Sequence, residues 1–355
     1  MRIYFIFVSI LFSVIFSYGA STGNTAVNFL RIGTGAKASG MGEAQVAISD
    51  NVDSLYWNPA GLSYVKNTEI SLMHLMYWQG ISYEYAAIAL PVKNFGTIGI
   101  GFDYLNSGNI DKTLENMTGS DYTPAGAFSY MAFAGIISYG NKFIIEKVPV
   151  SLGASIKLVG DRVENDMMLG AGLDFGLVYE FMKSGYLGIA INNIGITFSK
   201  NELLPLQLKV GGGYSADIIS KDHLVIGALD IVMPIDASIK VNTGLEYNFK
   251  NIFFLRAGYK INYALENITV GAGLRFNIKT TQYELNYSYT PGLEDVGSSQ
   301  RISLLMRFGL SLSGEISEKD RENYDNSKKE VLPAVPVKTN TSVYPAGSTP
   351  AMRRR

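Results

Sequence analysis

The chain has 355 residues, a formal net charge of −1 and no cysteine. The balanced charge argues against a basic surface for nucleic acid, and the lack of cysteine excludes disulfides, thiolate zinc sites, a cysteine nucleophile and a lipoprotein anchor. Only 17% of the residues are charged, whereas 37 glycines and 22 tyrosines are many for this length. This composition favours a membrane barrel over a soluble enzyme.

The first nineteen residues have the pattern of a secretory signal peptide. A short basic start, Met1-Arg2, precedes an apolar run over 3–16, and Ser17 and Gly19 are small residues before a cut. A membrane-spanning helix needs about 20 apolar residues, which is more than this run supplies. We therefore predict that residues 1–19 direct export and that the mature chain begins at Ala20.

Residues 20–66 are predicted to form a compact segment of short helices and turns, which we call the hatch. Its glycines, among them Gly33, Gly35 and Gly40, mark a backbone that bends and packs closely. Residues 33–40 resemble a phosphate loop only superficially, because the Gly-Lys-Ser/Thr ending is missing. The pattern therefore indicates a plug placed before the first wall strand of a barrel.

A short helix is predicted near the end of the hatch. Ser49 or Asp50 can cap it and Asp53 adds an anion to its first turn. Asn58-Pro59 should end it, because the residue before proline is pushed out of the helical region.

Pro59 to Gly61 then form a predicted turn. Trp57 and Asn58 have two open interpretations. In the first, they hold the hatch in the lumen and move when a ligand or cargo arrives. In the second, they only end the helix and fill space.

From about residue 68 the hydrophobic period is two, which is typical of β-strands. In residues 149–160, for example, Ile156 and Leu158 fall on one face and Ser155 and Lys157 on the other. Fourteen segments show this alternation: 68–77, 82–92, 95–106, 126–141, 149–160, 168–181, 185–195, 205–217, 222–233, 238–249, 252–261, 267–278, 280–290 and 300–311. The fold class predicted from this count is all-β, with residues 67–312 forming a 14-stranded antiparallel transmembrane β-barrel behind the N-terminal hatch.

The connections between these segments tend to alternate between short and long, with 107–125 the longest. Outer-membrane barrels have short periplasmic turns and longer outer loops, so both ends of the barrel are expected in the periplasm. Gly211 to Gly213 lie within a strand pattern. They either kink the wall and open a lateral gap or, as we favour, make room for the hatch backbone.

Charged side chains decide which face of each strand meets lipid. A basic side chain facing the bilayer midplane costs about 2–4 kcal/mol, so several of them would consume a typical folding stability. We therefore expect the polar faces to line the lumen and the apolar faces to meet the outer-membrane lipid. The charged residues predicted to face the lumen are Lys157, Lys209, Lys240, Glu246, Arg256, Arg275, Glu284 and Arg307.

No enzyme, metal or cofactor site is predicted. His74 and His223 are the only histidines, and neither has a nucleophile or a pocket in its sequence context. The acidic residues Asp50 and Asp53, with Asp174 or Asp230, fit no known metal loop. Residues 313–355 are charged, polar and proline-containing, which indicates a flexible periplasmic tail.

Two stretches resemble the PorV/PorQ family, which belongs to the FadL-like group of outer-membrane barrels. They are residues 29–63, FLRIGTGAKASGMGEAQVAISDNVDSLYWNPAGLS, with the turn over 58–61, and the closing strand over 299–304. The resemblance spans residues 26–311 and implies a fourteen-strand barrel with a hatch in the bacterial outer membrane. The tail departs from a barrel that ends in its last strand.

The resemblance implies two alternative functions. A PorV-like protein serves type IX secretion, with exported proteins or secretion-machinery components as partners. A FadL-like protein moves hydrophobic small molecules across the outer membrane. We expect the PorV-like role first and the FadL-like role as its alternative.

Overall fold

A computed structural model describes residues 23–115, 122–145, 148–293 and 296–309. The predicted signal peptide, 1–19, and the predicted tail, 313–355, lie outside these residues. Within the described ranges, helices long and apolar enough to cross a membrane do not occur.

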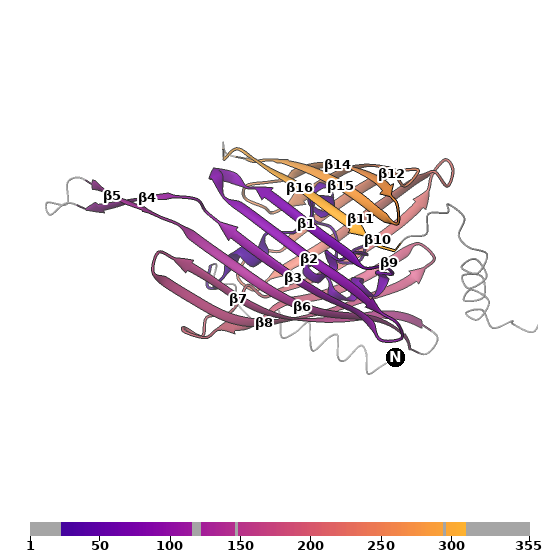
Figure 1. Cartoon of the computed structure of the whole chain (residues 1–355), viewed down its shortest axis with the longest axis horizontal. Coiled ribbons are helices and arrows are strands. Elements are labelled where there is room, and N and C mark those ends of the chain that lie inside the picture. Colours follow the sequence, from indigo (N-terminus) through magenta and orange to yellow (C-terminus); the bar gives the residue numbers. More distant parts are fainter. Residues whose placement is uncertain (1–22, 116–121, 146–147, 294–295, 310–355) are drawn as a thin grey trace, which may run out of the picture. The chain divides into compact units, whose positions relative to one another are not determined.

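Fourteen strands form a closed antiparallel barrel (Figure 1). Strands adjacent along the chain pair with each other, except that β3 pairs with β6, and β1 closes the barrel against β16. The barrel strands are β1 (Glu69–Met76), β2 (Ser82–Val92), β3 (Gly96–Asn106), β6 (Tyr130–Ile145), β7 (Val148–Val163), β8 (Asp166–Met182), β9 (Gly185–Thr197), β10 (Gln207–Asp217), β11 (His223–Pro234), β12 (Lys240–Phe249), β13 (Phe253–Ile261), β14 (Ile268–Ile278), β15 (Thr281–Pro291) and β16 (Ser298–Arg307). Each of the fourteen predicted segments overlaps one of these strands, so the predicted fold class is confirmed.

The predicted long loop over 107–125 is wrong in one respect. It contains two further strands, β4 (Ile110–Glu115) and β5 (Tyr122–Phe128), which pair with each other and not with the barrel. This hairpin projects past the rim of the barrel (Figure 1). We call this side the hairpin end, and the opposite side, where β1 begins and β16 ends, the turn end.

The two faces of the wall differ as the period of two requires. On β7, Ser155 and Lys157 are buried in the lumen, whereas Ile156 and Leu158 are 61% and 62% exposed on the outside. An apolar outer surface suits hydrocarbon, and ring closure leaves no unpaired strand edge to meet it.

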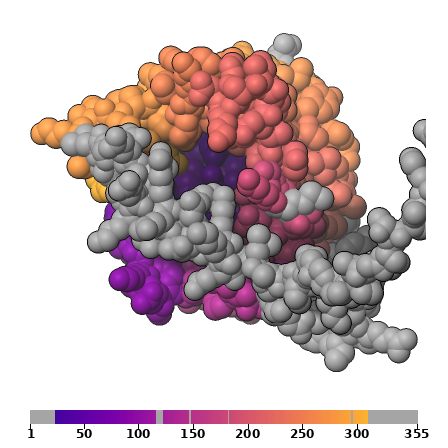
Figure 2. All heavy atoms as spheres, turned by 90° about the vertical axis from the view of Figure 1, so that its right-hand side faces the viewer, coloured from indigo at the N-terminus to yellow at the C-terminus, as the bar shows by residue number. Residues whose placement is uncertain are grey.

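The hatch lies inside the barrel. Figure 2 looks onto the turn end, where hatch atoms occupy the centre of the ring of strands. The hatch consists of four short elements, η1 (Asn28–Arg31), α2 (Ala36–Gly40), α3 (Ser54–Trp57) and η2 (Pro59–Tyr64), and a further short turn, η3 (Trp78–Gly80), connects β1 to β2.

The predicted helix start is wrong and its predicted end is correct. Asp53, not Ser49 or Asp50, holds the N-cap position of α3, and its side chain makes no capping hydrogen bond. The helix stops at Trp57 because Asn58, which precedes a proline, has extended dihedral angles. The predicted turn after it is the 3₁₀-helix η2, with Pro59 at its first position.

Candidate functional site

Asn58 ties the hatch to the barrel wall. Its side chain is fully buried and donates to the carbonyl of Val46 at 2.7 Å, and also to those of Leu177 in β8 at 3.2 Å and Ile189 in β9 at 3.4 Å. Its Oδ1 accepts the backbone N–H of Ala60 at 3.1 Å and so starts η2. One amide therefore fixes two hatch segments and two wall strands, more than the ending of a helix requires.

Tyr56 and Trp57 fasten α3 to the first part of the hatch. The Tyr56 hydroxyl donates to the carbonyl of Leu30 at 2.9 Å, and the Trp57 indole N–H donates to that of Thr34 at 3.1 Å. The two rings meet edge to face with centroids 4.8 Å apart. Both aromatic side chains thus have their polar atoms paired inside the lumen, as buried Tyr and Trp normally require.

The predicted hatch glycines sit where side chains have no room. A Cβ on Gly33 would lie 2.6 Å from the Trp57 ring, and one on Gly61 would lie 2.2 Å from a backbone carbonyl of the hatch. Gly35 has a φ of +82°, and a Cβ on it would lie 2.9 Å from the Asp53 carboxylate. Gly40 packs directly on Gly271 of β14.

A ring of wall glycines faces the hatch, and the sequence analysis missed it. Eight glycines, each from a different strand, would place an added Cβ within 2.6 Å of a hatch atom: Gly99, Gly140, Gly153, Gly176, Gly188, Gly213, Gly244 and Gly258. Gly211 and Gly213 face the hatch, where an added Cβ would lie 3.1 Å from Val46 and 2.1 Å from Ile48, respectively. Strand β10 pairs continuously with both neighbours, so the wall has no gap there. The signal in the sequence was a glycine at a lumen-facing position in successive strands.

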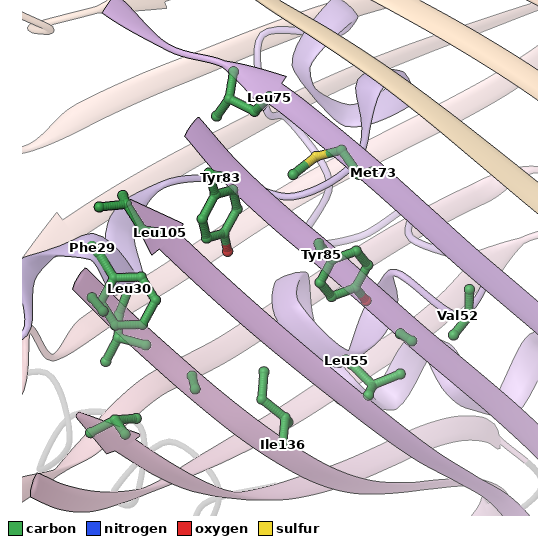
Figure 3. Close-up of a cluster of buried hydrophobic side chains, with 14 of the residues drawn as sticks. Phe29, Leu30, Val52, Leu55, Met73, Leu75, Tyr83, Tyr85, Leu105 and Ile136 are labelled. Carbon is green, nitrogen blue, oxygen red and sulfur yellow. The ribbon is translucent and has the colours of Figure 1, made fainter. Parts of the chain in front are cut away.

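The inner wall of β1–β3 and β6 is largely apolar, and we call it the apolar half. Met73, Leu75, Tyr83 and Tyr85 point inward there and meet hatch side chains such as Leu55 (Figure 3). The expectation that the lumen face is polar is therefore wrong on this side. The inner face of β2 is apolar because it packs on the hatch and not on water.

The inner wall of β12–β16 is charged, and we call it the charged half. Glu284 lies at its centre, 2.6 Å from Arg275, 3.1 Å from Arg307 and 3.7 Å from Arg256. Arg256 also contacts Glu246 at 2.5 Å. Three arginines and two glutamates thus form one connected network with little or no exposure to solvent, as a buried charge requires.

The same network connects the first and last strands to the hatch. Arg307 of β16 donates to Oε1 of Glu69 in β1 at 2.8 Å, and Oε2 of Glu69 accepts the backbone N–H of Val52 at 2.8 Å. One carboxylate therefore links the β1–β16 seam of the barrel to the hatch.

The three predicted lumen lysines differ in their partners. Lys157 is 2.8 Å from Asp174 and 2.9 Å from the Asn193 side chain, at a bulge between β8 and β9. Lys209 lies over the rings of Tyr56 and Trp57, and Lys240 lies over a third aromatic ring. All three ammonium groups therefore point inward, as do the other five charged residues predicted to face the lumen.

Two hatch carboxylates have opposite electrostatic environments. Burial alone would raise the pKa of Glu43, but Lys260 at 2.9 Å and Arg301 at 3.5 Å outweigh it and hold that pKa below its usual value. Asp53 has no such cation in contact, and burial raises its pKa to about 6. Asp53 is thus a hatch group that can change charge near neutral pH.

A cavity of about 310 Å³ lies between the hatch and β9–β11 at the turn end. Its wall is mostly apolar and aromatic, with Tyr64 and Tyr186 in edge-to-face contact. The lining residues are Ala47, Ile48, Ser49, Asp50, Tyr64, Tyr186, Tyr214, Ser215, Leu224 and Ile226. A volume of this size can hold a small organic molecule.

Neither histidine lines this cavity. His74 pairs with Glu84 on the outer face, and His223 hydrogen-bonds the Tyr247 hydroxyl. The part of the chain described above holds no group of three or more acidic or histidine side chains placed to bind a metal.

The fold is similar to those of solved structures described as hydrocarbon channels and toluene transporters. The toluene transporter TodX of Pseudomonas putida matches with a TM-score of 0.54 and 12% identity, covering 77% of this chain and 97% of that chain. The monoaromatic hydrocarbon channel CymD matches with a TM-score of 0.53 and 11% identity over 79% and 99%. The Ralstonia pickettii toluene transporter TbuX matches with a TM-score of 0.52 and 12% identity over 78% and 98%.

At these identities the likeness establishes the fold. No protein-family model matches the chain, and neither does any curated protein sequence.

Proposed function

We propose that the protein is a non-enzymatic, FadL-like outer-membrane channel that takes up hydrophobic small molecules. The observation that carries this proposal is the cavity of about 310 Å³ between the hatch and β9–β11, whose lining is mainly tyrosine and aliphatic side chains. Such a lining binds apolar and aromatic molecules through burial of surface and ring contacts. The solved structures with the same fold that are titled toluene transporters and hydrocarbon channels support the same choice.

The location follows from the surface of the barrel and its closure. An apolar exterior over fourteen strands requires lipid, and closed antiparallel barrels of even strand number are the form of bacterial outer-membrane proteins. An exported chain with short connections at the turn end would place that end in the periplasm and the β4–β5 hairpin outside the cell. The predicted signal peptide over 1–19 and the tail over 313–355 fit this orientation.

Passage of a hydrophobic molecule through the barrel requires movement of the hatch, because the hatch fills the lumen between the hairpin end and the cavity. The hatch groups in this mechanism are Gly33, Gly35, Gly40, Trp57, Asn58, Pro59 and Gly61. Asn58 and Trp57 hold the closed position through the hydrogen bonds described above. The charged half guides the hatch back to one position, because ion pairs have fixed geometry.

A pair of tryptophan substitutions on β11 tests the cavity. Ile226→Trp projects into it, whereas Leu229→Trp adds the same ring on the outer face of the same strand. We expect Ile226→Trp to reduce uptake of labelled toluene by expressing cells several-fold and Leu229→Trp to leave uptake unchanged. Equal uptake by both variants, with equal amounts in the outer membrane, would contradict the proposal.

A second candidate function is a PorV-like role in protein export, with exported proteins or secretion-machinery components as partners. The observation in its favour is the β4–β5 hairpin, which projects beyond the rim and exposes Leu114 and Ile110. Deleting residues 110–128 should abolish co-purification of an exported protein if this role is correct. A strain that lacks the whole protein provides the opposite test. If this strain loses toluene uptake but secretes the same proteins as the wild type, the export role is refuted.

A further inference from the structure

Two cavities lie along the same pair of wall strands. The cavity of about 310 Å³ at the turn end is lined by Ser215 of β10 and Ile226 of β11. A second cavity of about 30 Å³, toward the hairpin end, is lined by Lys209 and Asp230 of the same two strands. Because a strand rises about 3.3 Å per residue, Lys209 and Ser215 are about 20 Å apart. The two cavities therefore lie on one line of the inner wall, with a gap between them.

A turn of the hatch over residues 45–49 fills this gap. Two of its backbone N–H groups donate to the Gln45 carbonyl, at 3.2 Å and 3.0 Å, so the turn is closed on itself. Glu43, just before the turn, lines the smaller cavity, and residues 47–50 line the larger one. The turn is therefore the partition between the two cavities.

The wall beneath the turn carries almost no side chains. The Cβ positions of Gly211 and Gly213 on β10 point at the turn. Gly213 is paired with Ala228 of β11, which lies midway between Asp230 and Ile226 and hence on the same face of its strand. Two glycines and an alanine leave room that the turn fills, so displacement of the turn would join the two cavities into one passage.

Asp230 holds the turn against the wall. Its Oδ2 accepts the backbone N–H groups of Gln45 and Val46, at 2.6 Å and 2.9 Å. Within the described residues, no other wall side chain forms a hydrogen bond with the turn. From the hatch side, Asn58 donates to the carbonyl of Val46 at 2.7 Å. Since a hydrogen bond to a carboxylate is roughly twice as strong as a neutral one, this one side chain supplies the polar hold of the wall on the turn.

We infer that hydrophobic molecules pass along β10 and β11, and that the turn over 45–49 is the gate between the two cavities. Asp230 is the positioning residue that keeps this gate shut. The inference rests on the proposed function and assigns the movement to one short segment of the hatch. Other hatch contacts, such as that of Ser63 with Ser151 of β7, do not involve the turn and stay in place.

Disulfides that tie the hatch to the wall test which part of it moves. The chain has no cysteine, so introduced cysteines pair only with each other. An added Cβ on Gly213 lies 3.6 Å from the Cβ of Ile48, and a disulfide spans about 3.5–4.5 Å between these atoms. We expect the oxidised variant with Ile48→Cys and Gly213→Cys to lose toluene uptake at least several-fold, and a reductant to restore it.

The matched control ties a different part of the hatch to the wall. The hydroxyls of Ser63 in η2 and Ser151 in β7 are 2.7 Å apart, so Ser63→Cys with Ser151→Cys also permits a disulfide. Oxidation of this variant should leave uptake unchanged. Undiminished uptake with the first disulfide formed overturns the gate. Equal loss with both disulfides overturns the assignment to the turn, because the whole hatch would then move.

A second experiment tests the hold of Asp230 without any transported compound. Hydrogen exchange at residues 45–49 of the full-length protein should accelerate at least several-fold in Asp230→Ala. Asp230→Asn keeps an acceptor oxygen and should restore most of the protection. Asp103→Ala is the control, because Asp103 is equally buried but accepts its hydrogen bond from Tyr83 of the wall.

Unchanged exchange of the turn in Asp230→Ala, or equal acceleration in Asp103→Ala, contradicts the role of Asp230. The disulfide experiment leaves Asp230 intact and does not depend on the folding of these variants. Absence of toluene uptake by the wild type would refute the proposed function, and the exchange result would still decide whether Asp230 holds the turn.

Discussion

The apolar half and the charged half hold the same hatch by different physical means. In the apolar half, Leu55 and its neighbours lose contact with water, a force that is strong but has little directional preference. In the charged half, Lys260 and Arg301 pair with Glu43 of the hatch, and such ion pairs require fixed distances and angles. Burial therefore supplies much of the affinity of the hatch for the wall, and the charged contacts determine where along the wall it comes to rest.

The largest effect of a substitution is expected where the backbone of the wall contacts the backbone of the hatch. This contact belongs neither to the apolar half nor to the ion pairs of the charged half. Gly258→Val places a Cβ 2.0 Å from the backbone nitrogen of Gly42, and neither backbone can yield easily. We expect an assembled barrel with the hatch displaced, which raises single-channel conductance in planar bilayers. Gly227→Val, at a glycine with open space around it, is the control. Wild-type conductance in Gly258→Val would show that the hatch does not press on β13.

Next in size is the loss of the central carboxylate in the charged half. Glu284→Gln keeps the shape but leaves three arginines with one counter-charge fewer, and breaking a buried pair costs about 3–5 kcal/mol. Urea unfolding in detergent should show this loss of stability. Glu180→Gln removes one half of a more exposed pair with Lys142, which should cost about 0–1 kcal/mol. Similar losses in both variants would refute the central role of Glu284.

A core truncation in the apolar half should have a comparable or smaller effect. Leu55 is fully buried against Gly99 and Gly101, so Leu55→Ala leaves a cavity and should cost about 2–5 kcal/mol. The effect should appear as faster hydrogen exchange across the hatch with little change in the barrel strands. Leu255→Ala, on the outer face of β13, should leave hatch exchange unchanged. Uniform acceleration throughout the barrel would mean that the two parts unfold together.

The smallest expected effect is the pH dependence from Asp53. Its folded pKa of about 6 is above its ordinary value of 3.8, so the folded hatch binds more protons than the unfolded hatch between these values. Hatch stability should therefore fall as pH rises from about 4 to about 6 and then level off, by on the order of 1–3 kcal/mol.

Asp53→Asn should flatten the profile, and Asp50→Asn, at an exposed carboxylate, should not. Hydrogen exchange of the hatch across this pH range, corrected for the intrinsic rate, measures the profile. A rise in stability over the same window would contradict the assignment.

The barrel could be predicted from the sequence because its signal is local. Alternation along each strand needs no knowledge of the neighbouring strands, and the cost of a charge in lipid fixes which face of β7 holds Lys157. The end of α3 could also be predicted from a local signal, because Pro59 constrains the backbone of the residue before it.

The apolar half could not be predicted in the same way. Whether Tyr83 and Tyr85 face lipid or the hatch depends on a segment that is remote in the chain, because an apolar side chain suits either environment. The β4–β5 hairpin was missed because its short strands pair only with each other. The partners of Asn58 were missed because they are main-chain carbonyls, which any residue could supply.

The contact between Glu69 and Arg307 has a consequence for biogenesis. Its two side chains are 238 positions apart, one on the earliest wall strand to be synthesised and the other on the last. The Glu69 carboxylate accepts the backbone N–H of Val52, and it can pair with Arg307 only after β16 has been synthesised. The seam between β1 and β16 and this contact with the hatch would thus be completed together, at the last step of barrel folding.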